Sequence, residues 1–534
     1  VNSGGTEWFN VTGDKEIRHA FNFLMDRNYI VNDIYNGYAS PMYSCVMEWE
    51  PSAPEFQSVY NELGLTAAGD ETAAIQTINE RMDYWETQLG GRLEKVTDAG
   101  SPTGYWWYFD GNLLEFNAMI RIEDQRHETG LYIADQIEKC GIKVKRNEWE
   151  RTKAFSATYF VDPRTPPPDH WNLYTDGWVV GAPWKYPETS IAQMYAPWWG
   201  WMPGLGEPTW WNYTQNELDT LTKKIVNGQC NGVDDYWNTS RDALKLGIEE
   251  SVRAFCVSNL GYYPVNNRVS GIPYEKRSGL ASRWTFITSE TSGKTLKALQ
   301  YSSDGSVYWS AFNPVDGITD VYSNYIWRPV RDYGTWCNTE GEPISVRTPF
   351  TVEKDFHFEG ETLVGEIDVP SDAVIYDPVS ATWVTVGTGN KAVSKITYDF
   401  LFSSWHNGAP MDMREVKYHI ANIYDLCDNT DSVYNANFAI RNQPILDKIE
   451  GIKFVDEDTI EVYGDYQHPA SDDLIGDYYA KIVWPYMPWP LWEAMNYLIA
   501  NSGPISGNLY DYSDTGGEEW LDLLFSGHVE DIRA

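Results

Sequence analysis

Residues 112–144 read NLLEFNAMIRIEDQRHETGLYIADQIEKCGIKV, and this stretch decides the fold class. The apolar run over 112–122 predicts a strand. Over 125–141 the apolar side chains follow helical spacing, and Gly141 supplies a C-terminal stop. The alternating residues 142–144 then begin another strand. A helix that leads into a strand in this way indicates an α/β layer.

Segments on both sides of this stretch also show regular periodicity. Residues 14–37 place apolar side chains on one helical face, with an interruption at 26–28 and a stop at Gly37. Further expected elements are helices over 70–93, 215–226, 234–252 and 484–500, a buried strand over 171–180, mainly strands and turns over 290–400, a strand, turn and helix over 399–426, and a hairpin over 451–463. Helices and strands of this kind predict a mixed α/β protein.

The composition limits the class of protein. With 534 residues the chain can form two or three domains. Its 25 Trp, 36 Tyr and 19 Phe exclude a disordered chain, and they predict that some rings line a groove or a surface while others pack in the core. A formal charge of −37 repels phosphate backbones, so no nucleic-acid partner is expected.

The cysteines and the chain ends bear on the compartment. Six cysteines without a CxxC pair argue against zinc-finger and thioredoxin-type sites. Cys230 and Cys256 are the first candidates for a disulfide of an exported protein, with buried thiols as the alternative. Three N-x-S/T sequons are compatible with export, and no apolar run of 18 residues is present. The absence of a signal peptide at Val1 indicates a processed chain or a fragment.

Motifs of catalysis are missing from the sequence. It contains no HExxH, no GxSxG, no P-loop and no GxGxxG after a strand. The eight histidines are not at metal-ligand spacing, and the many carboxylates make any glycosidase-like pair uninformative. We therefore expect no catalytic residue, no cofactor and no metal site.

One segment is unusually rich in aromatic residues. Within 38 positions it contains, among others, Tyr174, Trp178, Trp184, Tyr186, Trp198, Trp199, Trp201, Trp210 and Trp211. Flat rings can sandwich peptide side chains or stack on the apolar faces of sugars, and each such contact adds about 0.5–1.5 kcal/mol beyond burial. The alternative is that these rings form an aromatic core.

Four blocks of the sequence, in order, resemble the family 5 extracellular solute-binding proteins, which are the oligopeptide, dipeptide and nickel binders of ABC importers. The blocks are Asp14–Tyr38, Ala134–Val144, Trp171–Trp178 (WNLYTDGW) and Asn212–Leu221 (NYTQNELDTL). A fifth block, Phe402–Met411 (FSSWHNGAPM) with Glu415 and Val416, resembles a segment that precedes the other four in most members. Its late position fits either the later part of a longer protein, such as the large archaeal-type surface members, or a permuted order of the family blocks, and the first explanation is favoured.

The resemblance implies a two-lobed, periplasmic-binding-protein-like α/β fold of type II, with extra β-rich segments and a ligand cleft between the lobes. Residues 1–205 would form a ligand-binding lobe, 206–285 the return through the hinge, and 286–534 the second lobe. The implied ligand-binding residues are Tyr174, Gly177, Trp178, Val180, Gly181, Trp184, Trp210 and Trp211. Partners would be an oligopeptide or oligosaccharide ligand and an ABC transporter permease, with membrane attachment only through an anchor outside this chain and an extracellular or cell-surface location.

One departure from the family affects the expected ligand. Peptide binders of the family commonly carry an Asp shortly after the Gly-Trp pair, where it meets the ligand's α-amino group. Here Gly177-Trp178 is followed by VVGAPW without an acid. A buried ammonium without a counter-charge is costly, so a neutral ligand such as an oligosaccharide is favoured. The competing functions are a secreted glycoside hydrolase and a structural cell-surface protein that retains the binding fold.

Overall fold

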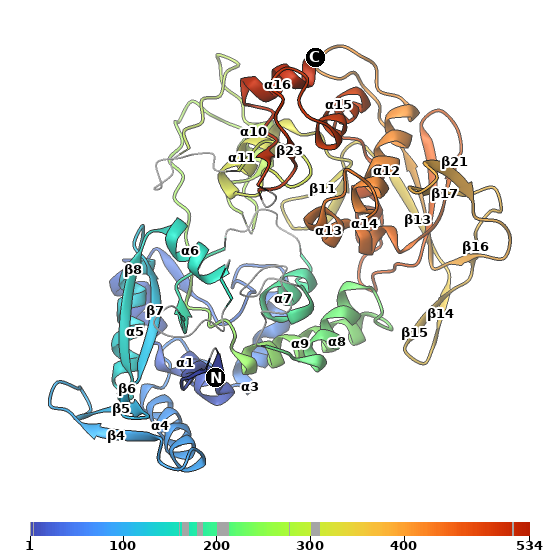
Figure 1. Cartoon of the computed structure of the whole chain (residues 1–534). Helices are drawn as coiled ribbons and strands as arrows, with labels where there is room; N and C mark the ends of the chain where they lie inside the picture. Colours follow the sequence, from blue (N-terminus) through green and yellow to red (C-terminus); the bar gives the residue numbers. More distant parts are fainter. Residues whose placement is uncertain are drawn as a thin grey trace. The chain divides into compact units, whose positions relative to one another are not determined.

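The computed structural model describes residues 2–3, 5–159, 161–162, 170–178, 185–199, 213–276, 278–300, 310–514 and 517–534. The chain forms two compact units (Figure 1). Unit 1 contains Val1–Val179, Lys185–Val226 and Asp234–Pro264, and unit 2 contains Asn227–Val233 and Val265–Ala534. Both units combine helices with sheets, so the expected mixed α/β fold class is confirmed.

The centre of unit 1 is a parallel sheet with the strand order β8-β7-β9. Strand β7 (Glu115–Arg121) is buried at every position after Glu115, and it pairs in parallel with β8 (Lys143–Trp149). Helix α5 (Arg126–Glu138) connects these two strands and packs on both of them. The stretch at 112–144 therefore folds into a strand, a helix and a parallel strand, as its periodicity predicts.

Strand β9 (Leu173–Tyr174) is much shorter than the strand expected over 171–180. It pairs with β7 through Ala118 and Met119 only. At the next position the hydroxyl of Thr175 accepts a hydrogen bond from the Arg121 backbone N–H at 2.8 Å. Because a side-chain oxygen here takes the place of a backbone carbonyl, the strand ladder ends.

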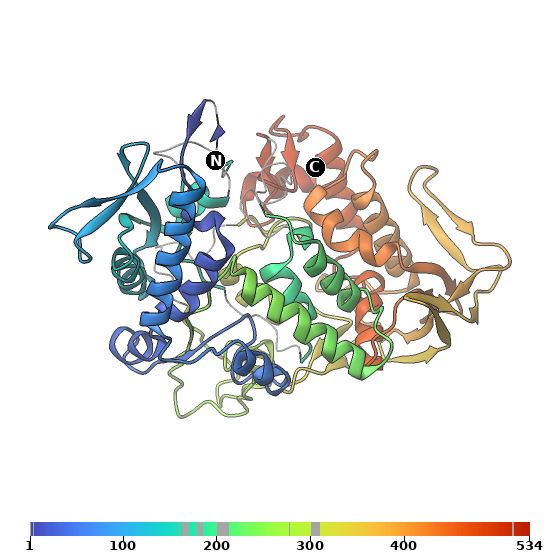
Figure 2. The same ribbon diagram turned by 90° about the horizontal axis from the view of Figure 1, so that it is seen from below.

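Helices cover this sheet and extend unit 1. Helix α1 (Lys15–Leu24) begins at Asp14, whose side chain accepts from the backbone N–H groups of Glu16 and Ile17. Figure 2 shows α1 beside the long helix α4 (Glu71–Gln88), with which it packs. The other elements of unit 1 are β1 (Asn2–Ser3), β2 (Thr6–Glu7), η1 (Val11–Gly13), α2 (Arg27–Tyr29), η2 (Ile30–Ile34), β3 (Ala39–Pro41), α3 (Ala53–Glu62), β4 (Leu93–Thr97), β5 (Tyr105–Phe109), β6 (Asn112–Leu113), α6 (Arg151–Tyr159), α7 (Glu188–Tyr195), η3 (Pro197–Trp199), α8 (Asn216–Val226), α9 (Val233–Glu250) and β10 (Val257–Asn259).

Arg27 is fully buried in unit 1, and no carboxylate in the described part of the chain pairs with it. Its guanidinium donates instead to backbone carbonyls: Nε to Met42 at 2.9 Å, Nη1 to Asn22 at 2.8 Å and Nη2 to Phe255 at 2.8 Å. The ring of Tyr43 lies 5.1 Å from the guanidinium carbon. One cation thus holds together the end of α1, the segment after β3 and the segment before β10.

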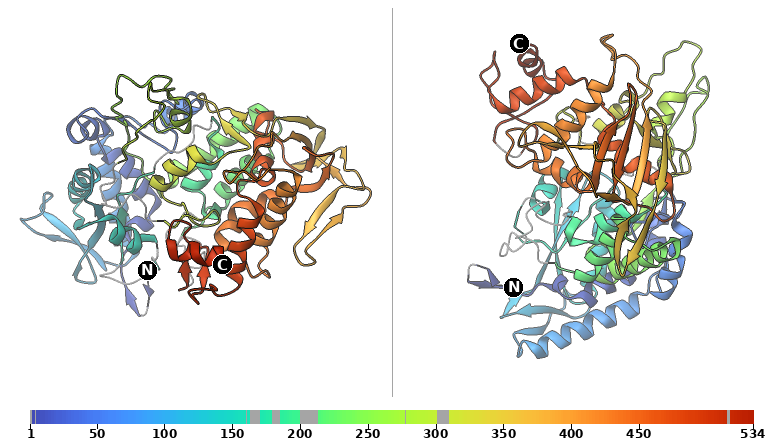
Figure 3. Two further views of the ribbon diagram at one scale, coloured as in Figure 1. Left: turned by 90° about the horizontal axis from the view of Figure 1, so that it is seen from above. Right: turned by 90° about the vertical axis from the view of Figure 1, so that its right-hand side faces the viewer.

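Unit 2 is built on an antiparallel sheet with the order β13-β20-β22-β21-β17-β18 (Figure 3). Its centre is the pair β20 (Ser394–Asp399) and β22 (Thr459–Gly464), with Ile396 opposite Val462. Helices α12 (Met413–Cys427) and α14 (Asp472–Val483) share one apolar core with this sheet. The other elements of unit 2 are α10 (Arg283–Thr288), α11 (Val321–Val330), β11 (Thr335–Cys337), β12 (Pro343–Ser345), β13 (Phe350–Lys354), β14 (Phe356–Glu359), β15 (Thr362–Gly365), β16 (Ile367–Asp368), β17 (Val374–Asp377), β18 (Thr382–Thr385), β19 (Lys391–Ala392), α13 (Ala436–Leu446), β21 (Ile449–Phe454), α15 (Trp489–Ala500), β23 (Tyr510–Asp511), β24 (Glu519–Trp520) and α16 (Ser526–Arg533).

The fifth sequence block lies in unit 2, where its Trp405 is bonded to helix α12. Glu415 in the first turn of α12 is 6% exposed. One carboxylate oxygen accepts from Trp405 Nε1 at 3.0 Å, and the other accepts from the Trp489 backbone N–H at 2.8 Å. Glu415 therefore joins the WHNG turn to the start of α15.

Two expectations from the sequence are wrong. Residues 321–330 form helix α11 inside a region expected to hold mainly strands and turns, because the Asp320 side chain caps the helix by accepting from Ser323 N at 2.9 Å. No disulfide joins any two of the six cysteines, all of which lie in the described part of the chain, so the pairing of Cys230 with Cys256 is wrong. Burial raises the pKa of Cys140 to about 12, which keeps that thiol protonated.

We predict that Arg27→Met destabilises the protein by about 3 kcal/mol or more, because it leaves several buried carbonyls without a donor. Urea unfolding followed by Trp fluorescence measures this free energy. The matched control is Arg268→Met at an exposed position, which is expected to stay within about 0.5 kcal/mol of the wild type. Equal effects of the two substitutions would contradict a stabilising role of the Arg27 hydrogen bonds.

We also predict that Glu415→Gln lowers the free energy of unfolding by about 2 kcal/mol, because an amide offers one acceptor where the carboxylate offers two to the two N–H donors. The exposed Glu457→Gln is the control, with an expected change near zero. Thermal unfolding of both variants makes the comparison, and an unchanged Glu415→Gln variant would show that the WHNG turn is held by other contacts.

Candidate functional site

The carboxyl ends of β7 and β9 meet at one edge of the parallel sheet of unit 1, where ligands commonly bind in α/β folds. After β7 the chain continues through Ile122, Glu123 and Asp124 to the start of α5. After β9 it continues through residues 175–178. Charged and aromatic side chains from both connections therefore gather at this edge, which we call the carboxyl edge.

Three of the expected ligand-binding residues lie here. Tyr174 ends β9 and is half-buried, Gly177 is exposed, and Trp178 is 36% exposed. The other five, Val180, Gly181, Trp184, Trp210 and Trp211, lie outside the described residues. The structure thus places Tyr174, Gly177 and Trp178 on one connection, and the indole of Trp178 is partly exposed there.

Tyr174 and Trp178 each contact a positively charged side chain. The hydroxyl of Tyr174 accepts from Arg121 Nη1 at 3.4 Å. Burial, together with the nearby negative charge of Asp176, raises the pKa of Tyr174 to about 12, so this hydroxyl stays protonated. The guanidinium carbon of Arg253 lies 5.3 Å from the Trp178 ring. An arginine on one face of the indole fixes its orientation.

Asp176, which precedes the Gly-Trp pair instead of following it, was not among the site residues expected from the sequence. Its carboxylate accepts from the Tyr159 hydroxyl at 2.8 Å and from the Gly177 backbone N–H at 2.8 Å. Burial, and after it the charge of Asp176, raises the pKa of Tyr159. Since two protein donors already occupy this carboxylate, it is poorly suited to be the main partner of a ligand's ammonium group. A search for an acid on both sides of Gly-Trp would have found it.

Two ion pairs stiffen the edge. Arg121 and Glu123 are 5% and 10% exposed, and Nε lies 2.8 Å from Oε2. Burial alone would raise the pKa of Glu123, but the bonds from Arg121 and from the Arg151 backbone N–H hold it below its usual value. Asp124 pairs with Arg126 at 2.6 Å. A Cβ added at Gly177 would lie 3.3 Å from Arg126 Nη1, so this arginine sits against the Gly-Trp connection.

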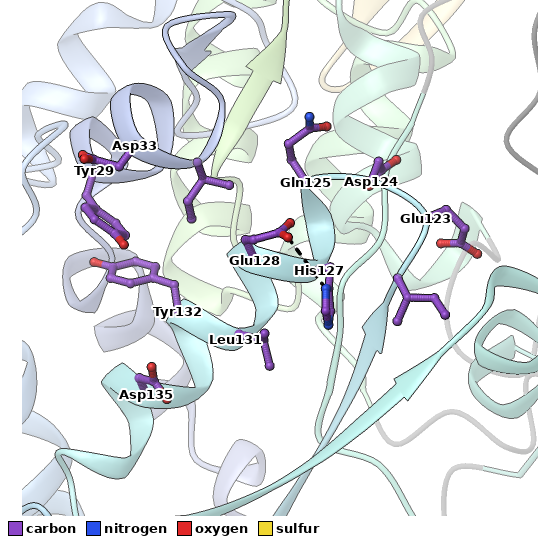
Figure 4. A pocket seen from close by; sticks show the side chains of 12 residues that line it. Tyr29, Asp33, Glu123, Asp124, Gln125, His127, Glu128, Leu131, Tyr132 and Asp135 are labelled. Carbon is purple, nitrogen blue, oxygen red and sulfur yellow. Dashed lines mark ion pairs between the residues drawn. The ribbon is translucent and has the colours of Figure 1, made fainter.

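A pocket of about 710 Å³ opens beside these pairs, between η2 and the first turns of α5 (Figure 4). The rings of Tyr29 and Tyr132 form part of its wall, with centroids 4.8 Å apart. Five carboxylates and one histidine contribute to the rest. The lining residues are Tyr29, Asp33, Ile34, Ile122, Glu123, Asp124, Gln125, His127, Glu128, Leu131, Tyr132 and Asp135. Such a lining repels anions and accommodates polar, neutral or cationic groups.

Other rings of the aromatic segment pack inside unit 1. Tyr186 is 6% exposed and stacks on Trp237 of α9 with a centroid distance of 6.1 Å. Trp198 donates from Nε1 to Thr222 of α8 at 2.8 Å, and Trp199 meets Trp198 edge to face at 5.2 Å. These three rings fit the alternative of an aromatic core, and the aromatic groove stays a prediction.

Two further searches cover the described residues alone. Among them, no group of three or more His, Cys, Asp or Glu side chains is placed to hold a metal ion. Within the same part of the chain, no helix combines the length and the apolar character needed to cross a membrane.

Comparisons with known proteins were made by sequence and by structure. No protein-family model and no curated protein matches the sequence. Similar solved structures include the oligopeptide-binding protein AppA from Bacillus subtilis in complex with a nonapeptide (17% identity, 51% of this chain, 46% of that chain, TM-score 0.36). Another is the mannohexaose-bound periplasmic oligopeptide-binding protein from Thermotoga maritima (12% identity, 51% and 48%, TM-score 0.37).

A third similar structure is NikA from Brucella suis in complex with Fe(III)-EDTA (17% identity, 47% of this chain, 43% of that chain, TM-score 0.32). The three structures are at most 17% identical to this chain, with TM-scores of at most 0.37, and the family resemblance stays a prediction made from the sequence blocks. The chain spans about half the length of the solved structures that it matches.

We predict that Glu123→Gln costs about 3 kcal/mol at pH 7, because it leaves the buried Arg121 without its counter-charge. Since the folded-state pKa of Glu123 is depressed, its contribution is present above the unfolded-state pKa and is lost as the pH falls through the folded-state value. The variant should therefore lose less stability than the wild type on acidification below about pH 4.5. Urea unfolding at several pH values measures both effects.

The control for this experiment is Glu128→Gln, which lines the same pocket with a 61% exposed side chain. It is expected to change the free energy of unfolding by less than about 0.5 kcal/mol. A wild-type acid dependence that persists unchanged in Glu123→Gln would assign the acid sensitivity to other carboxylates.

Proposed function

We propose that this chain is the extracellular solute-binding component of an ABC importer. The observation that carries the proposal is the carboxyl edge of unit 1, where the exposed indole of Trp178 is oriented by Arg253 next to a polar pocket. Three of the four ordered sequence blocks, Asp14–Tyr38, Ala134–Val144 and Trp171–Trp178, contribute residues to this edge or to the helices and strands beneath it. The chemistry offered is stacking and hydrogen bonding, which hold a solute without altering it.

The proposed ligand is an oligosaccharide or an oligopeptide, and the contacts favour the oligosaccharide. No acid follows Gly177-Trp178, and the acid before it, Asp176, already accepts from Tyr159 and Gly177. A neutral sugar face needs no counter-charge, and it stacks well on an exposed indole. Hydroxyl groups of a sugar can also bond to the carboxylates that line the adjacent pocket.

The remaining parts of the proposal follow the family pattern. Residues 1–205 and 286–534 would form the two lobes, joined through 206–285, and Val180, Gly181, Trp184, Trp210 and Trp211 would complete the ligand contacts. The partner would be an ABC permease, and an anchor outside this chain would keep the protein at the cell surface. We propose no catalytic role for any residue.

We predict that an oligosaccharide pool raises the melting temperature of the wild type more than a tripeptide pool does, because ligand binding stabilises the folded state by mass action. Trp178→Ala should abolish the shift with any hit, corresponding to an affinity at least about tenfold weaker. The matched control is Trp489→Ala in unit 2, at a similarly exposed indole (42%), which should retain the shift. Differential scanning fluorimetry provides the measurement.

Three outcomes would count against the proposal. A full shift in Trp178→Ala would move the site away from the carboxyl edge. Shortened sugars after incubation with the protein, detected by chromatography, would favour the glycoside hydrolase. The absence of any shift across both pools would favour the structural surface protein.

A further inference from the structure

Arg331, which follows helix α11 in unit 2, is a cation without an acidic partner among the residues that the structure describes. Its guanidinium lies between two tyrosine rings, with Cζ 3.8 Å from the centroid of Tyr486 and 4.7 Å from that of Tyr333. The side chain is half-buried, and none of the described carboxylates lies within ion-pair distance of it. In a chain with 77 acidic and 40 basic side chains, such an arrangement calls for a physical reason.

The adjacent acid does not compensate for this charge. Asp332 pairs with Arg347 at 2.7 Å, and Arg283 Nη2 lies 4.0 Å from its other oxygen. Arg283 itself donates to the backbone carbonyl of Arg331 at 3.3 Å, and its guanidinium carbon lies 5.3 Å from the Tyr333 ring. Two guanidinium groups therefore share Tyr333, which makes this a locally positive place in a strongly negative protein.

Several buried donors around Tyr486 also lack partners among the described residues. His419 is fully buried and meets Tyr486 edge to face at 4.9 Å, and neither of its ring nitrogens is hydrogen-bonded. The same holds for Arg331 Nε and for Nε1 of the fully buried Trp492. Burial, and after it the charge of Arg331, lowers the pKa of His419 to about 3, so the ring is neutral and retains one N–H donor. Such a group of neighbouring buried nitrogen atoms without hydrogen-bond partners is unusual in a protein interior.

Arg27 of unit 1 provides an internal comparison. It too has no carboxylate partner, but all three of its nitrogens donate to backbone carbonyls at 2.8–3.0 Å. Arg331 makes no such bond from its side chain in the described structure; its contacts are the two aromatic faces. The faces fix the plane of the guanidinium and leave its N–H edge for a partner in the same plane. Arg27 therefore has a structural role, whereas the N–H groups of Arg331 could bind a ligand.

We propose that Arg331, clamped between Tyr333 and Tyr486, binds the carboxylate group of a small organic acid. The fork of guanidinium N–H donors matches the two oxygens of a carboxylate, and a planar group fits between two ring faces better than a tetrahedral phosphate. The site lies within unit 2 and is independent of the solute proposed for the carboxyl edge of unit 1. A flat, aromatic carboxylate gains additional contact with the tyrosine rings.

The test uses the whole chain and a pair of probes that differ in charge alone, benzoate and benzamide. Isothermal titration calorimetry should detect benzoate with a Kd on the order of 1 mM and benzamide at least about tenfold more weakly. Inorganic phosphate is the third probe, and we expect it to bind more weakly than benzoate. Arg331→Gln, which keeps a planar amide and removes the charge, should weaken benzoate at least about tenfold. Arg414→Gln is the control, because its side chain is 78% exposed and pairs with Asp412.

Each result decides for or against the site. Equal binding of benzoate and benzamide, tighter binding of phosphate, or unchanged benzoate affinity in Arg331→Gln would overturn the proposal, as would no heat from benzoate up to about 10 mM. If Arg331→Gln does not fold by circular dichroism, Arg331→Lys replaces it. That variant keeps the charge but not the fork, so weakened binding of benzoate supports the site and unchanged binding contradicts it.

Discussion

The guanidinium of Arg27 joins three separate stretches of unit 1, and the rest of that unit depends on this contact. Arg27 begins α2 and bonds to the carbonyl of Asn22 in α1 and to carbonyls near β3 and β10, which are distant in the sequence. Arg18 of α1 adds bonds to the backbone and side chain of Glu250 at the end of α9. Both arginines belong to the first family-like block. Both arginines connect distant segments of unit 1, so these two residues of the block contribute to the fold and not to ligand binding.

Much of the fold could be predicted because it is encoded locally. The apolar spacing of α1, α4, α5, α8, α9, α12 and α15 is visible in the sequence, and so is the hairpin of β21 and β22. Helix α11 could not be found in this way, since its Tyr, Val and Ile are typical of strands, and a single capping contact of Asp320 starts the helix. Strand β9 ends early because of one hydroxyl, that of Thr175. In both cases one side-chain hydrogen bond outweighs the local pattern.

The candidate site likewise contains some residues that could be predicted from the sequence and others that could not. Tyr174, Gly177 and Trp178 could be proposed from the sequence because a strand end, a run of aromatic residues and the family-like block mark them, and their role in binding stays a prediction. Asp176 was missed, although it is adjacent, because the hydrogen bond that it accepts comes from Tyr159, which lies 17 positions away in the sequence. The pocket could not be predicted either, since its wall pairs Tyr29 with Tyr132, and only the packing of η2 against α5 brings them together. A site whose residues come from several connections forms only when the chain folds. The periodicity within one segment cannot predict it.

The arginines of this acidic chain show how a charge acquires either a structural or a binding role. Arg27 donates to carbonyls from every nitrogen, and Arg121 donates to Glu123 and Tyr174, so both cations have hydrogen-bond partners inside the protein. A cation with such partners stabilises the folded state. Arg331 contacts ring faces instead, and these contacts do not use its N–H groups. Contacts with aromatic rings can therefore orient a charged group without neutralising it. A binding site needs a charge that is oriented and still able to bond to a ligand.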